Sequence, residues 1–254
     1  MDMSVFDLFK IGIGPSSSHT VGPMVAARRF LIECGPLVDA SAIEVALYGS
    51  LALTGVGHAT DKAVIIGLMG ETPQDVDPHQ VEDKLDEVAL DGVLTLLGVQ
   101  PVPFQALQHL VFHKQESLPE HPNGMRFTLT RGDGSRTSRV FYSVGGGFIR
   151  AEGEGDKAGV NPGAPVPYPF DTMADLLACG EASGLSIPQM LRANECARMS
   201  EAALDAGLDR IAAVMAGCIE QGLRAGGELP GGLHVKRRAA SLWRQAQDTR
   251  EVGN

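Results

Sequence analysis

The chain has few basic residues and no long apolar run, and both absences exclude whole classes of protein. Its 254 residues include 21 Lys and Arg against 31 Asp and Glu, a formal net charge of −10 at pH 7. Nucleic acid and anionic membranes both require a basic face, so neither is expected as a partner. No stretch reads as a membrane span, and the first residues lack the pattern of a signal peptide. We therefore expect a cytoplasmic protein.

Cysteines are also few, and they are far apart in the chain. The four are Cys34, Cys179, Cys196 and Cys218, with no CxxC pair among them. In a cytosolic chain, cysteines in apolar helical stretches are reduced and mostly fill the core. We do not expect a metal site built from these four.

The short motifs of several common enzyme classes are missing as well. There is no GxSxG elbow, no HExxH pair, no Walker A loop and no GxGxxG turn after a strand. None of the six lysines stands in an obvious Schiff-base setting, and no internal repeat is found. The length and the ordinary composition allow one large domain or two small ones.

One Gly-rich stretch is dense in hydroxyls, and it reads GIGPSSSHTVGPM over residues 12–24. Its serines precede a predicted helix, at whose start free N–H groups and the helix dipole favour an anion. A single serine would be enough for an ordinary N-cap. Three serines and an imidazole between flexible glycines favour a ligand site instead.

Two further stretches combine glycine with histidine. Residues 49–62 read GSLALTGVGHATDK and precede another apolar helix; the plainer alternative is that Thr60 or Asp61 only caps this helix and His58 is exposed. Residues 121–124, His-Pro-Asn-Gly, predict a tight turn. If the three loops converge, they bring imidazoles for proton transfer and N–H and hydroxyl groups for an anion.

The order of the predicted elements indicates two parts. Strands and helices mix up to residue 150, a Gly-, Pro- and acid-rich linker covers 151–169, and only helices follow over 170–254. We therefore predict an α+β domain over 1–150, with helices on a mixed sheet, followed by an all-α segment. The predicted strands are 42–48, 93–102, 110–113, 125–130 and 139–143; the later predicted helices are 170–179, 186–203, 208–223 and 235–247.

The motifs carry a resemblance to a known family. FDLFKIGIGPSSSHTVGPM over residues 6–24 resembles the N-terminal signature of bacterial iron–sulfur L-serine dehydratases. Weaker matches follow in the same order, so that the resemblance covers nearly the whole chain: GVGHATDK at 55–62, HPNG at 121–124, SVGGGFI at 143–149 and LPGGLHVKRR at 229–238.

This resemblance implies α,β-elimination of L-serine to pyruvate and ammonia by a homodimer. It implies an oxygen-sensitive 4Fe–4S cluster, with no pyridoxal phosphate. It also implies that the first domain is similar to the allosteric substrate-binding domain of some D-3-phosphoglycerate dehydrogenases, and that the helical segment begins the catalytic domain.

Site residues follow from the matched motifs. The base is predicted among His19, His58 and His121, with the first two preferred. The predicted substrate-binding residues are Ser16, Ser17, Ser18, Thr20, Thr60, Asp61 and Asn123. No metal ligand is expected in this chain, because the family's cluster cysteines are expected downstream of Asn254.

We therefore expect a chain that does not turn over substrate alone and that needs a C-terminal catalytic part. Two alternatives remain open. One is a non-catalytic regulatory module that binds L-serine, and the other is a subunit that needs a cysteine-bearing partner chain.

Overall fold

The computed structural model describes residues 4–155, 165–229 and 234–251, which form two compact units. One unit comprises residues 11–159 and 228–236, and it holds the sheet. The other is helical and comprises residues 1–10, 160–227 and 237–254. Residues 156–164 of the predicted linker lie outside the described residues, and the domain boundaries at 150 and 170 stay a prediction.

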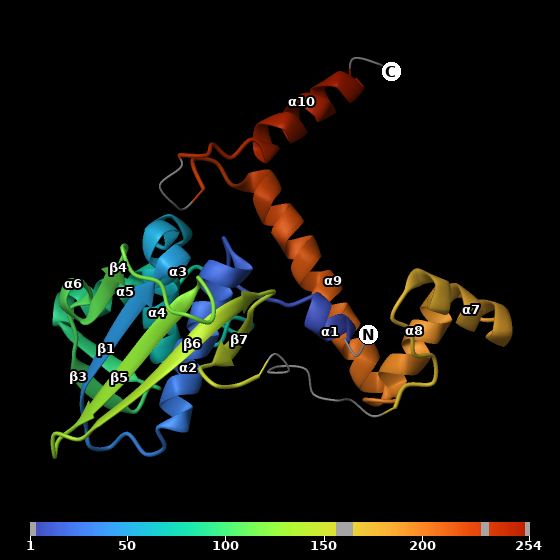
Figure 1. Cartoon of the computed structure of the whole chain (residues 1–254). Coiled ribbons are helices and arrows are strands. Elements are labelled where there is room, and N and C mark those ends of the chain that lie inside the picture. The colour runs from blue at the N-terminus through green and yellow to red at the C-terminus, as the bar shows by residue number, and fades with distance from the viewer. Residues whose placement is uncertain (1–3, 156–164, 230–233, 252–254) are drawn as a thin grey trace. The chain divides into compact units, whose positions relative to one another are not determined.

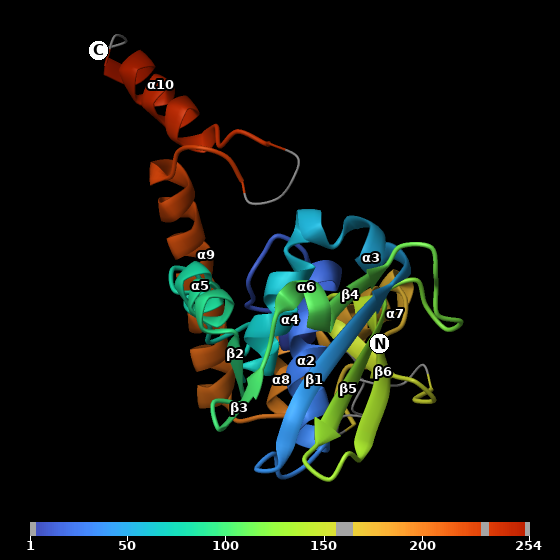
Figure 2. The same ribbon diagram turned by 90° about the vertical axis from the view of Figure 1, so that its left-hand side faces the viewer.

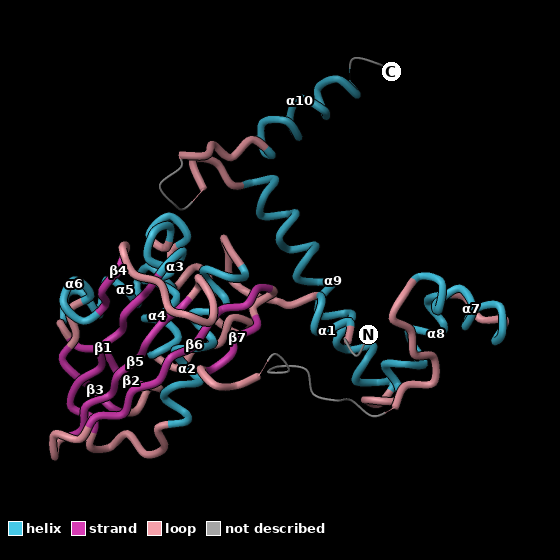
Figure 3. The backbone as a smooth tube through the Cα atoms, in the orientation of Figure 1, coloured by secondary structure: helices cyan, strands magenta, loops and turns pink. Residues whose placement is uncertain are grey.

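A five-stranded sheet forms the centre of the α+β unit (Figure 1). Its strand order is β4-β1-β5-β6-β7; β4 runs parallel to β1, and every other neighbouring pair is antiparallel. This mixed sheet, followed by helices, confirms the predicted fold class (Figure 3). The strands are β1 Ala40–Tyr48, β4 Leu110–His113, β5 Gly124–Arg131, β6 Arg136–Gly145 and β7 Phe148–Ala151.

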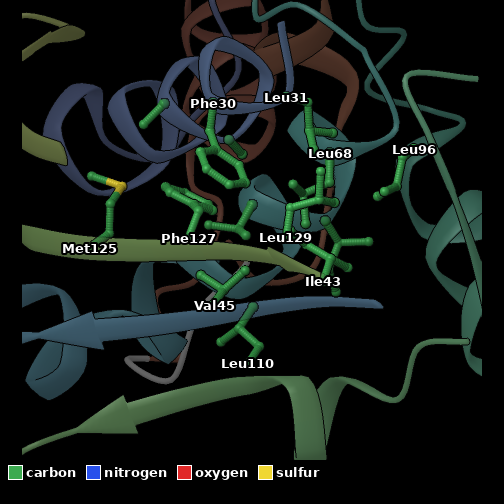
Figure 4. Close-up of a cluster of buried hydrophobic side chains, with 14 of the residues drawn as sticks. Phe30, Leu31, Ile43, Val45, Leu68, Leu96, Leu110, Met125, Phe127 and Leu129 are labelled. Carbon is green, nitrogen blue, oxygen red and sulfur yellow. The ribbon is translucent and has the colours of Figure 1, made fainter. Parts of the chain in front are cut away.

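Helices α2 (Gly22–Glu33) and α4 (Thr60–Leu68) cover one face of this sheet and enclose the core (Figure 4). Alternate side chains of β1 point into the core, and Ile43, Val45 and Leu47 are at most 2% exposed. This alternation is what a strand with one buried face requires. Across the layers the rings of Phe30 and Phe127 stack with their centroids 5.5 Å apart.

The predicted strand over residues 93–102 is wrong, because the chain makes a hairpin there. β2 (Val93–Leu96) pairs antiparallel with β3 (Gln100–Pro103). Leu97 and Gly98 turn the chain with φ angles of 46° and 69°, and a left-handed Leu is rarely signalled by sequence. The unit's other elements are a π-helical turn Ser17–Val21, α3 Gly49–Thr54, a 3-10 turn Val56–His58, α5 Val81–Asp91 and α6 Ala106–His109.

The helical unit contains five described helices, and several predicted boundaries are wrong, including the start of the predicted helix 208–223, which begins at Glu201. The predicted helix 186–203 ends at Cys196, and a new helix begins where the Ser200 hydroxyl accepts the N–H of Ala203 at 3.2 Å. The last helix begins at Ala239 because Lys236 pairs with Glu228 in a β-bridge. The helices are α1 Val5–Leu8, α7 Met173–Ser183, α8 Ile187–Cys196, α9 Glu201–Arg224 and α10 Ala239–Glu251.

The N-terminal helix α1 is fastened to α8 and α9. The buried carboxylate of Glu195 accepts the Ser4 hydroxyl and the Val5 N–H, each at 2.8 Å. The Phe6 ring lies over Gly207, where a Cβ would overlap it. These contacts explain why the first ten residues belong to the helical unit although the α+β unit follows them directly.

The cysteines do not fill the core, so that prediction is wrong. Cys34 and Cys179 are half-buried, whereas Cys196 and Cys218 are exposed on their helices. Among the described residues, no helix is both long enough and apolar enough to cross a membrane.

Candidate functional site

The first hydroxyl-rich loop folds into a π-helical turn that runs directly into α2. Ser16 caps this turn, because its hydroxyl accepts the N–H of His19 at 3.2 Å. In return, the N–H of Ser16 donates to the Thr20 hydroxyl at 3.2 Å. The hydroxyls of Ser16 and Thr20 therefore shape the loop.

Two threonines lock this loop to the one that precedes α4. The Thr20 hydroxyl donates to the carbonyl oxygen of His58 at 2.8 Å, and the Thr60 hydroxyl donates to that of His19 at 2.5 Å. Thr20 and Thr60 are 3% and 0% exposed. Both were predicted to bind substrate, but their hydroxyls are already used by these backbone bonds.

The locked loops bring two imidazoles together. The ring centroids of His19 and His58 lie 4.8 Å apart, with 39° between the ring planes. His19 also has a hydroxyl at each ring nitrogen: Ser18 Oγ lies 2.9 Å from Nδ1, and Ser50 Oγ lies 3.0 Å from Nε2. Burial lowers the pKa of His19 below 6.5, and nearby His58 lowers it further, while a hydrogen bond to the Ser50 backbone raises it. The balance of these effects favours the neutral ring of His19.

Backbone partners set the tautomers of the other two candidate bases. His58 Nδ1 lies 2.9 Å from the carbonyl oxygen of Thr54, which only accepts, so Nδ1 carries the proton and Nε2 keeps its lone pair in the neutral ring. His121 Nδ1 accepts the N–H of Asn123 at 3.1 Å, so its neutral ring carries the proton on Nε2. Burial, and secondarily Arg150, lower the pKa of His121. His58 is thus arranged as a proton acceptor and His121 as a donor.

The third loop joins the other two through Ser50. The N–H of Ser50 donates to the Pro122 carbonyl at 2.9 Å, while the Ser50 hydroxyl contacts His19. The three Gly-rich loops therefore do meet. Within the described contacts, His121 itself touches neither His19 nor His58.

Ser143 connects the strand β6 to the same region. Asn123 Nδ2 donates to its carbonyl at 3.1 Å, and its N–H donates to the Asn123 carbonyl at 3.0 Å. The Ser143 side chain fits over Gly22 at the start of α2, where a Cβ would overlap its hydroxyl. That hydroxyl is fully buried and has no described hydrogen-bond partner.

Donors for a carboxylate remain at the start of the π-helical turn. The first N–H groups of a helix have no acceptor inside the helix. Within the described part of the chain, no acceptor is found for the N–H groups of Ser17 and Ser18 or for the hydroxyl of exposed Ser17. Asp61 lies half-buried in the first turn of α4. Asn123 is occupied with the His121 loop and Ser143.

Sequence reasoning missed Ser50, Thr54 and Ser143 as members of this cluster. The signal for Ser50 is the preceding Gly49, whose φ of 52° turns the chain out of β1. Gly49 has no room for a Cβ, which would overlap the Pro122 carbonyl. The contact of Thr54 uses only its backbone oxygen, so no residue type announces it.

A metal centre has no ligand set in the described residues. No three His, Cys, Asp or Glu side chains gather there in a way that could hold a metal ion. The four cysteines are all free. The residues present therefore do not fit an iron–sulfur cluster.

Comparison with known proteins gives a consistent family. The family profile described as "Serine dehydratase beta chain" matches residues 4–154. The chain is 45% identical over 256 residues to the L-serine dehydratase TdcG of Escherichia coli, covering 99% of this chain and 56% of that protein. It is 42% identical over 253 residues to an L-serine dehydratase of Streptomyces coelicolor, covering 96% and 55%. It is 40% identical over 259 residues to an L-serine dehydratase of Haemophilus influenzae, covering 99% of this chain and 56% of that protein. The chain thus spans about half the length of these relatives.

Proposed function

Because the chain belongs to the serine dehydratase beta chain family, as the resemblance indicated, we propose that it forms part of an L-serine dehydratase. The observation that carries the proposal is the pair of imidazoles, His19 and His58, held 4.8 Å apart between loops rich in hydroxyl and free N–H groups. Such a pair suits proton transfer next to a bound carboxylate.

In this proposal the start of the π-helical turn binds the substrate carboxylate. The N–H groups of Ser17 and Ser18 and the Ser17 hydroxyl are the available donors. Ser16, Thr20 and Thr60 act by holding the loop. Asp61 and Asn123 border the site, and Asn123 positions the His121 loop.

His58 is the proposed base, because its Nε2 has a lone pair facing no described donor, whereas His121 presents a proton. Removal of the Cα proton and loss of the β-hydroxyl as water give 2-aminoacrylate. This enamine tautomerises to an imine, which takes up one water to release pyruvate and ammonia. His19 lies beside His58 and can pass a proton between Ser18 and Ser50.

The resemblance also implies a 4Fe–4S cluster that would accept the leaving hydroxyl. Since the described residues do not fit such a cluster, we assign no step to it. We propose that the ligands lie in a C-terminal part equivalent to the rest of the relatives, and that the complete protein is a cytoplasmic homodimer. The chain as given is then inactive alone.

The test compares His58→Gln with His79→Gln in the complete protein, purified without oxygen. His79 is an exposed histidine on a turn and serves as the matched control. Loss of a general base lowers kcat by about 10²–10⁴-fold. Pyruvate formation should fall by that factor in His58→Gln, at unchanged iron content, and stay constant in the control. Full activity of His58→Gln would reject His58 as the base.

The same preparations separate the alternatives. Saturable binding of L-serine without pyruvate formation, in an iron-supplied and anaerobic sample, indicates a regulatory module. Activity that appears only after a second polypeptide is added indicates a subunit of a larger enzyme.

A further inference from the structure

The outer face of the sheet, opposite α2 and α4, carries a hollow of about 570 Å³. In Figure 2, strands β1, β5 and β6 lie in front of α2, and the short helix α6 borders the hollow with Gln108 and His109. None of the residues lining the hollow belongs to the cluster around His19 and His58. It is therefore a second candidate site.

A small residue on β1, between β4 and β5, creates this hollow. Ala46 of β1 lies between Val111 of β4 and Arg126 of β5 in the strand register. The next residues of β1 on the same face are much larger, Glu44 on one side and Tyr48 on the other. The methyl group of Ala46 is therefore the floor of a space that its neighbours enclose.

Arg126 forms a wall of the hollow, and an aromatic stack holds it in place. Its Nη1 donates to the Tyr48 hydroxyl at 3.2 Å, and its guanidinium carbon lies 5.5 Å from the Tyr48 ring centroid. Tyr48 is 4% exposed, and its ring stacks on His113 at 4.8 Å, with only 9° between the planes. A guanidinium fixed in this way loses little entropy when it binds a carboxylate through two parallel N–H groups.

The charges in the hollow leave this arginine available. Two arginines, two histidines and one glutamate line it. The glutamate, Glu44, already pairs with Arg136 at 2.6 Å. Among the described contacts Arg126 has no carboxylate partner, although the whole chain has a net charge of −10. Within the described residues, the hollow thus offers one positive charge without a carboxylate partner beside the apolar side chains of Ala46 and Val111.

We propose that this hollow binds a small monocarboxylate. The carboxylate pairs with the guanidinium of Arg126, and the short carbon skeleton lies over Ala46 and against Val111. This proposal does not depend on the proposed dehydratase activity, since it uses none of the same side chains.

The test titrates the full chain with propionate at pH 7 by calorimetry, while the Ala46 methyl and Arg126 Nε–H signals are followed by NMR. Both signals should shift with a common, saturable dependence on concentration. Arg126→Gln should weaken binding at least tenfold. Ala46→Leu fills the floor without changing a charge and should weaken it equally. Arg126→Lys keeps the charge but loses the paired N–H groups, so its affinity for propionate should lie between those of the parent chain and Arg126→Gln.

Arg224→Gln, on the exposed surface of α9, is the control and should bind propionate as the parent chain does. Unchanged binding in Ala46→Leu would overturn the proposal even if Arg126→Gln disturbed the fold. The proposal would also be overturned if binding did not saturate at about 10 mM propionate, a concentration at which a millimolar dissociation constant is detectable. Tighter binding of inorganic phosphate than of propionate would reject the monocarboxylate class. Pyruvate serves as a further probe: if it binds near His58 only, its affinity will not respond to Ala46→Leu.

Discussion

The contact between Gly22 and Ser143 permits a sharp test of how the site loop is held. A Cβ added at Gly22 would overlap the Ser143 hydroxyl and lie 2.9 Å from the Ser143 Cβ. Forcing an extra methyl into a packed interior costs about 1–3 kcal/mol. A helix gains up to about 1 kcal/mol when Ala replaces Gly, which offsets part of that cost. We expect Gly22→Ala to lower the free energy of unfolding by roughly 2 kcal/mol.

A second variant removes the Ser143 hydroxyl, which a Cβ at Gly22 would overlap. The Ser143 hydroxyl is buried without a described partner, and leaving such a group unsatisfied costs about 1–3 kcal/mol. Ser143→Ala alone should therefore be neutral or stabilising. Combined with Gly22→Ala, it should recover more than half of the lost stability, because only the weaker Cβ overlap remains.

Urea unfolding followed by circular dichroism measures all three variants, and their m values should agree. Gly67→Ala is the matched control, since its Cβ would overlap the Met24 backbone oxygen, which Ser143→Ala cannot relieve. Gly57 has open space around it, so Gly57→Ala should change little. The reasoning is refuted if the effects of Gly22→Ala and Ser143→Ala add to within about 0.5 kcal/mol, as they would at independent sites.

Three further predictions follow from the described contacts. The pKa of His19 is lowered in the folded state, so as the pH drops this histidine is protonated first in the unfolded chain. The free energy of unfolding should therefore fall as the pH drops below 6.5. In urea titrations, His19→Gln should make the free energy of unfolding less dependent on pH. Ser50→Ala removes the hydroxyl that lies 3.0 Å from His19 Nε2 but keeps the Ser50 backbone, whose hydrogen bond raises the pKa of His19. An NMR titration of the ring should therefore give the same lowered pKa as in the parent chain, and a clear change contradicts the assignment. Glu195→Ala removes both oxygen acceptors that hold the start of α1, so the amide exchange rate over residues 5–8 should rise about tenfold or more. In Glu195→Gln a carbonyl acceptor remains, and the exchange rate should rise less. Equal exchange rates in the parent chain and both variants would contradict the role given to Glu195.

Much of the fold could be predicted because the responsible signals are local. The alternation of Ile43, Val45 and Leu47 identified β1, and the glycines and prolines marked most of the turns. The helix break before Ser200 was missed, since residues 197–199 carry no Pro or Gly to signal it. The left-handed Leu97 was missed for a similar reason, as tertiary packing overrides the preference of that residue.

The loops that form the candidate site could be predicted, but not the roles of their residues or the membership of Ser50, Thr54 and Ser143. Three Gly-rich loops with histidines were identified, and the structure brings them together. Which ring nitrogen carries the proton depends on a carbonyl of Thr54 and an amide of Asn123, and neither contact leaves a trace in residue type. The use of Thr20 and Thr60 as locks likewise depends on backbone oxygens of the opposite loop.

The attachment of α1 to Glu195 also has a consequence for synthesis of the chain. Ser4 leaves the ribosome before its partner Glu195, which follows 191 residues later. At about 5–20 residues per second, this delay is roughly 10–40 seconds. During that time Phe6 lacks its contact with Gly207 of α9, while residues 11–159 of the α+β unit emerge and can fold. Closure of α1 onto α8 and α9 thus has to wait until residue 195 has emerged, after the residues of the sheet and of the His19–His58 loops have left the ribosome.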